Sequence, residues 1–552
     1  MKTTLLFIAG LSINIANAQT FEYLDINLVK ARVNSGGDLH WDPTTGNSGY
    51  ECPQGSGKTW SSTASIWMGG LDVGGQLHLA AQTYHQSGVD FWPGPLTTSG
   101  ATTNSTTVNQ YNRVWKLNKT DIDDFLTNFA NGNVQNGSFT PTADLLSWPA
   151  NGDISQNYAS QLAPYMDVDG DAVYNPMAGD YPLIKGDQAI YTIFNDAHQL
   201  HQSAGKILGT EVHLMAYAYG PCSITSNNSF LNYTTFYNFK IINRSSFALV
   251  NTYAGLFNDF DLGTYMDDYV GSDVADHYAY SYNSLISPSN EPAIGIVQLK
   301  GPIESSNSID DDFDGTIDEP LEQMSMTNFM YFNNSFPGVP LSQVDPSNAS
   351  QYFQYMNGFW RDGTPLTCGG NGYGGSTPTK FAYTSNTYTN GPCGTTSWVE
   401  NGAGSDKKFV MSSGPYTLQP GAVDELEYAY IVSFDSITNN PLAKLDTDVQ
   451  TLHSIYNSTL NQCLTTSIKE QKNQTVFTLS PNPTNGTLNI SCDLKTNGFK
   501  IEVIDALGKV LISEEYKVLN QTSINVSNLS SGIYFVKVIS GENTSTKKFI
   551  KE

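Results

Sequence analysis

Oxygen-bearing side chains alternate along one short stretch of the chain in the way that a hard cation requires. Asp167, Asp169 and Asp171 stand two residues apart, and Asn175 follows four residues later. A tight loop can wrap such alternating oxygens around a single ion at roughly 2.4 Å. A solvated acidic turn would carry the same composition. We therefore predict a calcium site formed by these four residues, with the solvated turn as the alternative.

A second acidic stretch agrees with the start of an EF-hand loop. Counted from Asp310, it has Asp at the first, third and fifth positions, Gly at the sixth and an apolar residue at the eighth. It departs at the twelfth position, where Leu321 replaces the bidentate Glu. Asp318 or Glu319 must then supply that oxygen, unless the stretch is a solvated turn. The predicted ligands are Asp310, Asp312, Asp314, Thr316, Asp318 and Glu319.

A third candidate cluster lies near the middle of the chain. Its members are Asp259, Asp261, Asp267 and Asp268, which again allow a solvated turn as the alternative. In all three clusters we expect calcium to have a structural role, because a bound cation cross-links a loop that is too polar to pack by itself. Even sites of millimolar affinity are filled at extracellular calcium concentrations.

Signatures of catalysis are weak in this sequence. Residues 57–59, Gly-Lys-Thr, look like the end of a phosphate-binding loop, but Cys52 occupies the position of the required first glycine. His198 and His201 lack the His-Glu-x-x-His spacing of a zinc protease, and no Gly-x-Ser-x-Gly segment marks a hydrolase serine. The paired carboxylates of a glycosidase cannot be recognised in a sequence, because their separation is spatial. A hydrolase therefore stays open as an alternative.

Several tryptophans fall in polar, turn-rich segments, where an aromatic ring can stack on a sugar. The same rings can instead fill the cores of their own loops, which is the interpretation that we favour. The tryptophans concerned are Trp41, Trp60, Trp92 and Trp360.

The chain is strongly acidic, with 52 Asp and Glu against 27 Lys and Arg and a net charge of −25. Such a chain repels phosphates, which argues against a nucleic-acid partner. Tyr and Gly are abundant, at 31 and 48 residues, and this favours strands and long turns over helices. Among six cysteines, Cys368 and Cys393 bracket a loop rich in Gly, Asn and Thr, which we expect a disulfide to close.

Runs of alternating apolar and polar residues recur through the middle of the chain. This period of two is typical of strands, and it predicts a mainly β fold with a central antiparallel β-sandwich and long loops. Residues 442–460 then carry apolar residues on one face at helical spacing, which predicts a helix. The expected strands are residues 211–219, 233–242, 248–260, 293–299 and 425–434.

The start of the chain has the pattern of a secretory signal. Lys2 provides positive charge, an apolar run begins at Leu5, and small residues precede a cleavage point between Ala18 and Gln19. The apolar run is too short to span a bilayer, and no later segment has about 20 uninterrupted apolar residues. We therefore predict a signal peptide over residues 1–18 and no transmembrane segment.

The last part of the chain, residues 476–552, consists of short alternating strands between turn residues, which predicts a small immunoglobulin-like β-sandwich. Its characteristic motifs are Ser480-Pro481-Asn482-Pro483, Gly486, Asp505 with Gly508, Gly532-Ile533-Tyr534 and Lys547-Lys548-Phe549. With these motifs in order, the segment resembles the type A C-terminal sorting domain of the type IX secretion system of Bacteroidetes. The resemblance implies passage across the outer membrane by the type IX machinery, with release or attachment at the cell surface.

Much of the segment 25–435 resembles an uncharacterised family of large secreted Bacteroidetes proteins. The likeness rests on motifs such as Phe-Trp-Pro-Gly-Pro at 91–95 and Asp-Phe-Asp-Leu-Gly at 259–263, and it implies no activity. The expected organisation is a signal peptide (1–18), a loop-rich β region with a calcium loop (19–210), a β-sandwich region with an Asp-rich loop (211–465), a linker (466–475) and the sorting domain (476–552).

Together these features predict an exported protein at the cell surface or outside the cell. We expect a calcium-stabilised, β-rich protein that binds or adheres to a polysaccharide or another surface ligand. The alternative is a secreted hydrolase of glycans or peptides, since such enzymes often carry this kind of tag. A structural component of a surface layer is a third, weaker interpretation. A deep pocket with converging acids and shifted pKa values would favour the enzyme, whereas flat sandwich faces would favour binding.

Overall fold

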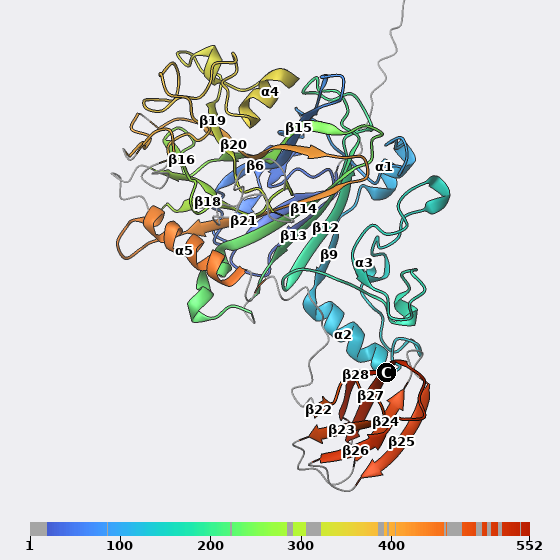
Figure 1. The fold of residues 1–552 in the computed structure, drawn as a ribbon. Coiled ribbons are helices and arrows are strands. Elements are labelled where there is room, and N and C mark those ends of the chain that lie inside the picture. Colours follow the sequence, from blue (N-terminus) through green and yellow to red (C-terminus); the bar gives the residue numbers. More distant parts are fainter. Residues whose placement is uncertain are drawn as a thin grey trace, which may run out of the picture. The chain divides into compact units, whose positions relative to one another are not determined.

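The computed structural model describes residues 19–85, 87–220, 223–283, 291–304, 322–384, 391–394, 397–402, 404–456, 460, 477–492, 499–504, 509–516, 521–540 and 543–552. The chain divides into two compact units, residues 1–464 and 465–552. Antiparallel strands dominate each unit, which confirms the predicted mainly β class (Figure 1). Among the described residues, no helix is both long enough and apolar enough to span a bilayer.

The first unit contains a five-stranded antiparallel sheet that draws its strands from distant parts of the chain. Strands from the first hundred residues pair with strands beyond residue 240, so the sheet ties both halves of the unit together. In spatial order its strands are β19 (Asn328–Asn333), β20 (Lys407–Leu418), β15 (Leu249–Phe260), β6 (Ser61–Leu71) and β7 (Leu77–Ala81).

A second sheet of the same unit has nine strands. Four of the five expected strands lie in it, and the fifth is β15 of the smaller sheet. Its path is β16 (Asp268–Asp273), β17 (Tyr278–Asn283), β18 (Ala293–Lys300), β21 (Val423–Ser433), β14 (Thr234–Asn243), β13 (Thr210–Ala218), β12 (Gln188–Asn195) and β8 (Trp92–Pro93), with β9 (Trp115–Asn118) also paired to β12.

The two sheets share one hydrophobic core, as a sandwich requires. Tyr430 of β21 packs against Phe260 of β15 with ring centroids 6.0 Å apart. The Tyr430 hydroxyl also donates to the Asn258 side chain, which satisfies both polar groups inside the core. Strands from residues 19–210 and from 211–465 therefore build the same sandwich and share its core.

Helix α5 (Pro441–Ile455) covers the outer face of the nine-stranded sheet, where it buries Leu445, Val449 and Leu452 (Figure 1). The helix begins directly after Asn440, whose side chain accepts from the Ala443 N–H. Its α-helical part starts one residue before the expected range of 442–460, and Tyr456 and Leu460 continue in π-helical conformation. Because the sheet is covered on both sides, nine of the ten residues of β14 are buried. The apolar periodicity of the helix thus predicted its buried face correctly.

The outer face of the five-stranded sheet carries its own aromatic layer. Trp67 of β6 stacks on Phe257 of β15 with ring centroids 4.7 Å apart. Phe332 of β19 stacks in turn on Tyr355 of helix α4 (Ala349–Met356), at 4.8 Å. This layer fixes the outer side of β15, the strand that carries Asp259 near its end.

Smaller elements surround the two sheets. A disulfide between Cys368 and Cys393, whose Cα atoms are 5.4 Å apart, closes the loop that the sequence indicated. The remaining elements are β1 (Phe21–Leu24), β2 (Lys30–Asn34), β3 (Trp41–Asp42), β4 (Asn47–Ser48), β5 (Tyr50–Glu51), β10 (Tyr165–Met166), β11 (Tyr181–Pro182), α1 (Ser105–Tyr111), α2 (Lys119–Ala130), α3 (Ala143–Leu146) and the short 3₁₀ turns η1 (Ile154–Gln156), η2 (Pro176–Ala178), η3 (Ser226–Tyr233) and η4 (Leu341–Gln343).

The second unit consists of two small antiparallel sheets around a separate core that includes Phe477, Val536 and Phe549. This agrees with the small sandwich expected at the end of the chain. One sheet contains β22 (Phe477–Ser480), β23 (Thr487–Cys492) and β26 (Gln521–Asn525), and the other contains β25 (Val510–Tyr516), β24 (Phe499–Ile504), β27 (Gly532–Ser540) and β28 (Asn543–Lys551).

Candidate functional site

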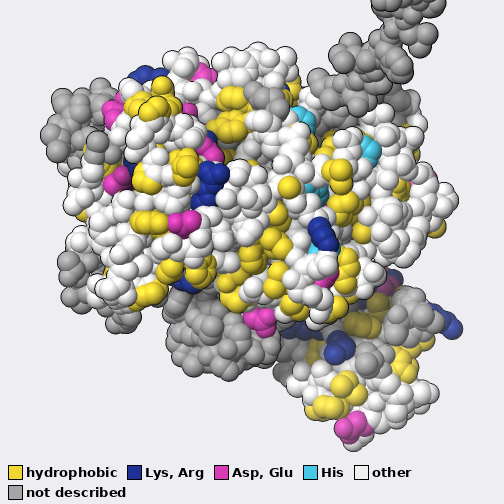
Figure 2. All heavy atoms as spheres, turned by 90° about the horizontal axis from the view of Figure 1, so that it is seen from above, with side chains coloured by type: hydrophobic (Ala, Val, Ile, Leu, Met, Phe, Trp, Pro, Cys, Tyr) yellow, Lys and Arg dark blue, Asp and Glu magenta, His cyan; other side chains and the backbone are white. Residues whose placement is uncertain are grey.

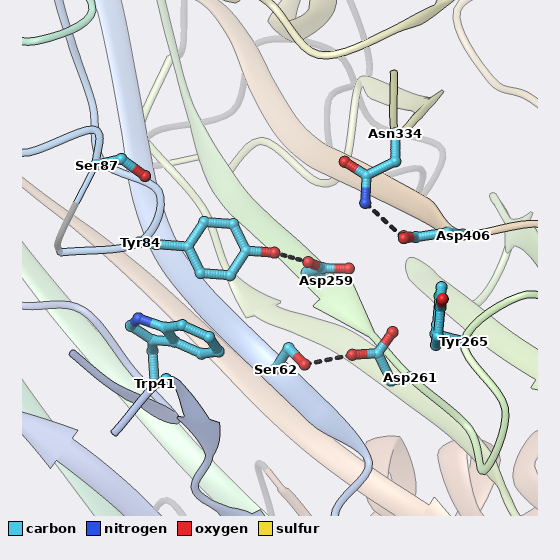
Figure 3. A pocket seen from close by; sticks show the side chains of 10 residues that line it. Trp41, Ser62, Tyr84, Ser87, Asp259, Asp261, Tyr265, Asn334 and Asp406 are labelled. Carbon is cyan, nitrogen blue, oxygen red and sulfur yellow. Dashed lines mark hydrogen bonds between the residues drawn. The ribbon is translucent and has the colours of Figure 1, made fainter. Parts of the chain in front are cut away.

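Strand ends meet at one edge of the five-stranded sheet, and a pocket of about 410 Å³ lies there (Figure 3). β19 and β15 end at this edge, whereas β20 and β6 begin there, because neighbouring strands run antiparallel. The pairs Asp259–Lys408 and Phe260–Ser61 mark the edge. The residues that follow or precede these strands in the chain therefore converge in space.

Three aspartates form the acidic part of the pocket. Asp259 lies near the end of β15, Asp261 follows that strand, and Asp406 directly precedes β20. One carboxylate oxygen from each lies within 4.8 Å of the other two. Oxygens on opposite sides of a calcium ion are about 4.8 Å apart when each lies about 2.4 Å from it. The three aspartates therefore have the spacing of one cation's ligand shell.

Each of the three carboxylates also accepts a hydrogen bond from a neutral donor, as Figure 3 shows. The pairs are Tyr84 with Asp259, Ser62 with Asp261 and Asn334 with Asp406. These donors fix the positions of the carboxylates without cancelling their charge, which is how outer residues orient metal ligands. The other oxygen of Asp259, Oδ1, is buried and has no hydrogen-bond partner among the described residues. A buried oxygen of this kind is explained by a water, a proton or a bound ion.

The carboxyl groups of the pocket have too little positive charge near them to balance their own. Burial raises the pKa of Asp259 well above its usual range, and the nearby Lys408 offsets only part of that effect. Burial also raises the pKa of Asp406, against a hydrogen bond from Asn334 and the charge of Lys408. The negative charge of the group therefore favours uptake of a proton or of a cation.

Aromatic rings form the other part of the pocket. Trp41 and Tyr84 meet edge to face with ring centroids 4.8 Å apart, and Tyr265 is 50% exposed. In Figure 3, Trp41 and Tyr84 lie on one side of Asp259, whereas Asp406 and Tyr265 lie on the other. The pocket thus joins an apolar wall to a set of oxygen ligands.

The predicted cluster of Asp259, Asp261, Asp267 and Asp268 is divided by the fold. Asp259 and Asp261 line the pocket, but Asp268 is buried elsewhere and accepts from the Leu262 N–H at 3.3 Å. Burial raises the pKa of Asp268 to about 9. Asp267 is exposed and lies outside the group of three.

The predicted loop at 167–175 is present, with a different set of acids around it. Asp167 and Asp169 approach Asp180, which is completely buried and accepts from the N–H groups of Val168 and Asn175, both at 2.8 Å. Asp171 instead accepts from the Val173 N–H, and the Asn175 side chain accepts from the Met177 N–H at the start of η2. Asp180 thus joins Asp167 and Asp169 in the cluster of acids, whereas Asp171 is not part of it.

The run from Asp310 to Glu319 lies outside the described residues, so its ligands Asp312, Asp314, Thr316 and Asp318 stay predictions. A further acidic group, which the sequence did not indicate, brings together Asp273, Asp276 and Asp446.

His201 and two of the four candidate tryptophans have structural roles. His201 is buried, and its two ring nitrogens contact the carbonyl oxygens of Leu79 and Asp196, each at 2.6 Å. Trp60 and Trp360 are buried, as expected for rings that fill loop cores, whereas Trp41 lines the pocket. Sequence patterns did not indicate Asp406, Tyr84 or Asn334, because each comes from a different strand end.

Side chains on the face drawn in Figure 2 are mixed, with hydrophobic, acidic and basic groups interspersed. Isolated apolar side chains are ordinary on a protein surface. The pocket at Asp259 is therefore the stronger candidate for a functional site.

Residues 478–552 match the family described as the secretion system C-terminal sorting domain, which confirms the resemblance noted in the sequence. The domain marks cargo of the type IX, or Por, secretion system, and the match does not extend to the central region. The protein therefore interacts with that machinery and is secreted across the outer membrane to the cell surface or the extracellular space.

A search of curated proteins finds no match. Among solved structures, a polysaccharide lyase shares 7% identity and a TM-score of 0.18, over 62% of this chain and 34% of the lyase. A BSP domain of a biofilm-associated protein shares 9% identity and a TM-score of 0.13, over 97% of this chain and 81% of that domain. The chain thus spans about a third of the lyase's length. At these scores neither likeness bears on the fold or the function.

Proposed function

We propose that this secreted protein acts at the cell surface or outside the cell as a calcium-stabilised binding or adhesion protein. The observation that supports this most strongly is the group Asp259, Asp261 and Asp406, whose oxygens lie within 4.8 Å of one another. Neutral donors hold these carboxylates, and the buried Oδ1 of Asp259 has no hydrogen-bond partner among the described residues. A cation bound here offsets most of the negative charge of the group and joins the end of β15 to the start of β20.

Calcium is the ion that fits the ligands and the location. All three ligands are carboxylate oxygens, which hard cations prefer, and calcium accepts six to eight oxygens in flexible geometry. Magnesium demands a near-ideal octahedron and releases its waters reluctantly. Outside the cell even a weak calcium site is occupied. The group of Asp167, Asp169 and Asp180 is proposed as a further structural calcium site. The acidic stretch from Asp310 to Glu319 is proposed as another on its sequence pattern.

The proposal is tested on the chain from residue 19 to 552 by calcium titration calorimetry and by thermal unfolding with and without a chelator. The double variant Asp259→Asn, Asp261→Asn should bind one calcium ion fewer than the unmodified chain and lose part of the calcium-dependent rise in Tm. Asp124→Asn, an exposed acid on α2, is the control for the loss of charge. Equal calcium stoichiometry and equal Tm shifts in the double variant and the unmodified chain would contradict the site.

A hydrolase of glycans or peptides is the second candidate, because the pocket contains an acid with a shifted pKa. The raised pKa of Asp259 suits a general acid, and Asp261 or Asp406 would act as the partner carboxylate. Carboxyl groups this close correspond to the short separation of retaining glycosidases, roughly 5–5.5 Å. Release of reducing ends from polysaccharides, or of amines from casein, by the unmodified chain but not by Asp261→Asn would support the enzyme.

A further inference from the structure

The apolar wall of the pocket offers a surface for the ring of a ligand. Trp41 and Tyr84 meet edge to face at 4.8 Å, and both are only partly buried. An aromatic face packs against the C–H groups of a sugar ring while the ring's hydroxyls stay free to bond elsewhere. Of the four tryptophans that the sequence singled out, Trp41 is the one that lines this pocket.

Polar side chains of the pocket offer partners for hydroxyl groups. Ser62 and Asn334 place a hydroxyl and an amide beside the carboxylates, and Ser87 adds a hydroxyl on the side of Tyr84 (Figure 3). Three carboxylate oxygens are also too few for a calcium ion, which takes six to eight. Water or a ligand must complete the shell, and two neighbouring hydroxyls on a sugar ring present two oxygens side by side for this purpose.

Size and charge narrow the class of ligand further. A volume of about 410 Å³ lies within the range of small-molecule sites, roughly 300–1,000 Å³, which suits one end of a glycan better than a folded protein. Three carboxylates around one divalent cation keep one negative charge, and the whole chain carries −25. An anionic sugar or a phosphate is repelled by such a site, whereas a neutral sugar is not.

We infer that the Asp259 pocket binds the end of a neutral glycan, with a sugar ring against Trp41 and Tyr84 and two neighbouring hydroxyls on the bound calcium. The inference rests on the proposed function, because it needs the cation at Asp259, Asp261 and Asp406. It names the ligand class that the binding protein would hold. A basic peptide, drawn to the carboxylates themselves, is the competing ligand that the test must separate.

The test uses Tb³⁺ in place of calcium on the chain from residue 19 to 552. Tb³⁺ emits when nearby aromatic rings are excited, and its lifetimes in H₂O and D₂O report how many waters it coordinates. The difference in emission between the unmodified chain and Asp259→Asn, Asp261→Asn isolates the ion in this pocket. The probes are the methyl glycosides of mannose, galactose and fucose in excess, and the peptide acetyl-Lys-Gly-Lys-amide.

We expect at least one methyl glycoside to lengthen the Tb³⁺ lifetime as a pair of coordinated waters is replaced. Trp41→Ala should keep the Tb³⁺ emission from the pocket, at lower intensity, and lose the response to sugar. Trp92→Ala, a half-buried tryptophan outside the pocket, should keep both.

The other outcomes are distinct from one another. Identical emission from the unmodified chain and the double variant would remove the cation site, and with it the proposed function. Emission that depends on Asp259 and Asp261 but responds to no sugar would overturn the glycan inference and leave the calcium site in place. Displacement of Tb³⁺ by the lysine peptide would make a basic peptide the ligand, which also overturns the inference.

Discussion

Asp259 and Lys408 lie directly opposite each other on β15 and β20, yet the Lys408 ammonium donates to Asp345 at 2.8 Å and to Asn334 at 2.9 Å. Asn334 in turn donates to Asp406. Lys408 thus acts on Asp259 through space and on Asp406 through an amide. Since burial still raises the pKa of both aspartates, this one lysine leaves the acidic group short of positive charge.

Replacing Lys408 by Met should lower stability without calcium and raise the affinity for calcium. The variant leaves Asp259 and Asp345 without their nearby cation, and we expect a loss of about 1–3 kcal/mol, reduced because the Asp345 side chain is 36% exposed. The lost positive charge no longer repels an incoming cation, so calcium binds several-fold more tightly. Urea unfolding in chelator and calcium titration measure the two effects.

Lys119→Met is the matched control, because Lys119 is an exposed lysine in an ion pair on α2. It should change stability and calcium affinity little. Weaker calcium binding by the Lys408 variant than by this control would show that Lys408 supports the cation site instead of opposing it.

The buried carboxyl of Asp268 should make stability depend on pH. Burial raises its pKa to about 9 in the native state, while an unfolded chain keeps the ordinary value of 3.8. Between these values the native state binds more protons than the unfolded state, so the free energy of unfolding falls as pH rises, by up to about 1.4 kcal/mol per pH unit. Asp268→Asn, which cannot ionise, should flatten this fall between roughly pH 5 and 8.

Urea unfolding at a series of pH values measures that slope. Asp267→Asn changes the exposed neighbour and should keep the slope of the unmodified chain. Equal slopes for the Asp268 variant and the unmodified chain would mean that Asp268 is ionised in the native state.

The strands and the long helix were predictable because each is encoded within one continuous segment. β13, β14, β15, β18 and β21 fall on the alternating runs at 211–219, 233–242, 248–260, 293–299 and 425–434. The buried face of α5 likewise follows from apolar residues at helical spacing. The sorting domain was predictable for another reason, since it carries several specific motifs in order.

The pocket was only half predictable, because its residues come from separate strand ends. Asp259 and Asp261 are close in sequence and were predicted as ligands. Asp406 lies 145 positions from Asp261 and reaches it only because β20 pairs with β15. Asp268 was predicted to lie with Asp259 and Asp261 because it is close to them in sequence, but it is buried outside the pocket. Residues that are neighbours in an acidic run can enter different environments when the chain turns between them.

Replacing Asp180 by Ala should weaken the loop at 167–175 more than any change to its exposed acids. The buried Asp180 carboxylate accepts from the N–H groups of Val168 and Asn175, and these donors lose their acceptor in the variant. We expect a loss of about 1–3 kcal/mol in chelator, and a smaller response to calcium if an ion binds with Asp167 and Asp169. Asp171→Asn, outside the cluster, should change neither stability nor the calcium response.

Urea unfolding in chelator and in calcium measures both effects. An Asp180→Ala variant as stable as the unmodified chain would show that the loop holds its shape without this carboxylate.

Export should fail when the core of the second unit is disrupted. Val536 is fully buried in this core, and Val536→Asp would place a carboxylate there, at a cost of several kcal/mol that a small sandwich cannot absorb. The type IX machinery then meets an unfolded tag, so the protein should accumulate in the periplasm and disappear from the cell surface and the medium. Cell fractionation in a host with this secretion system measures the distribution.

Val510→Asp is the matched control, because Val510 lies in the same unit but is 46% exposed, and it should be exported normally. Equal export of both variants would show that the machinery recognises the tag through its linear motifs and does not need its folded sandwich.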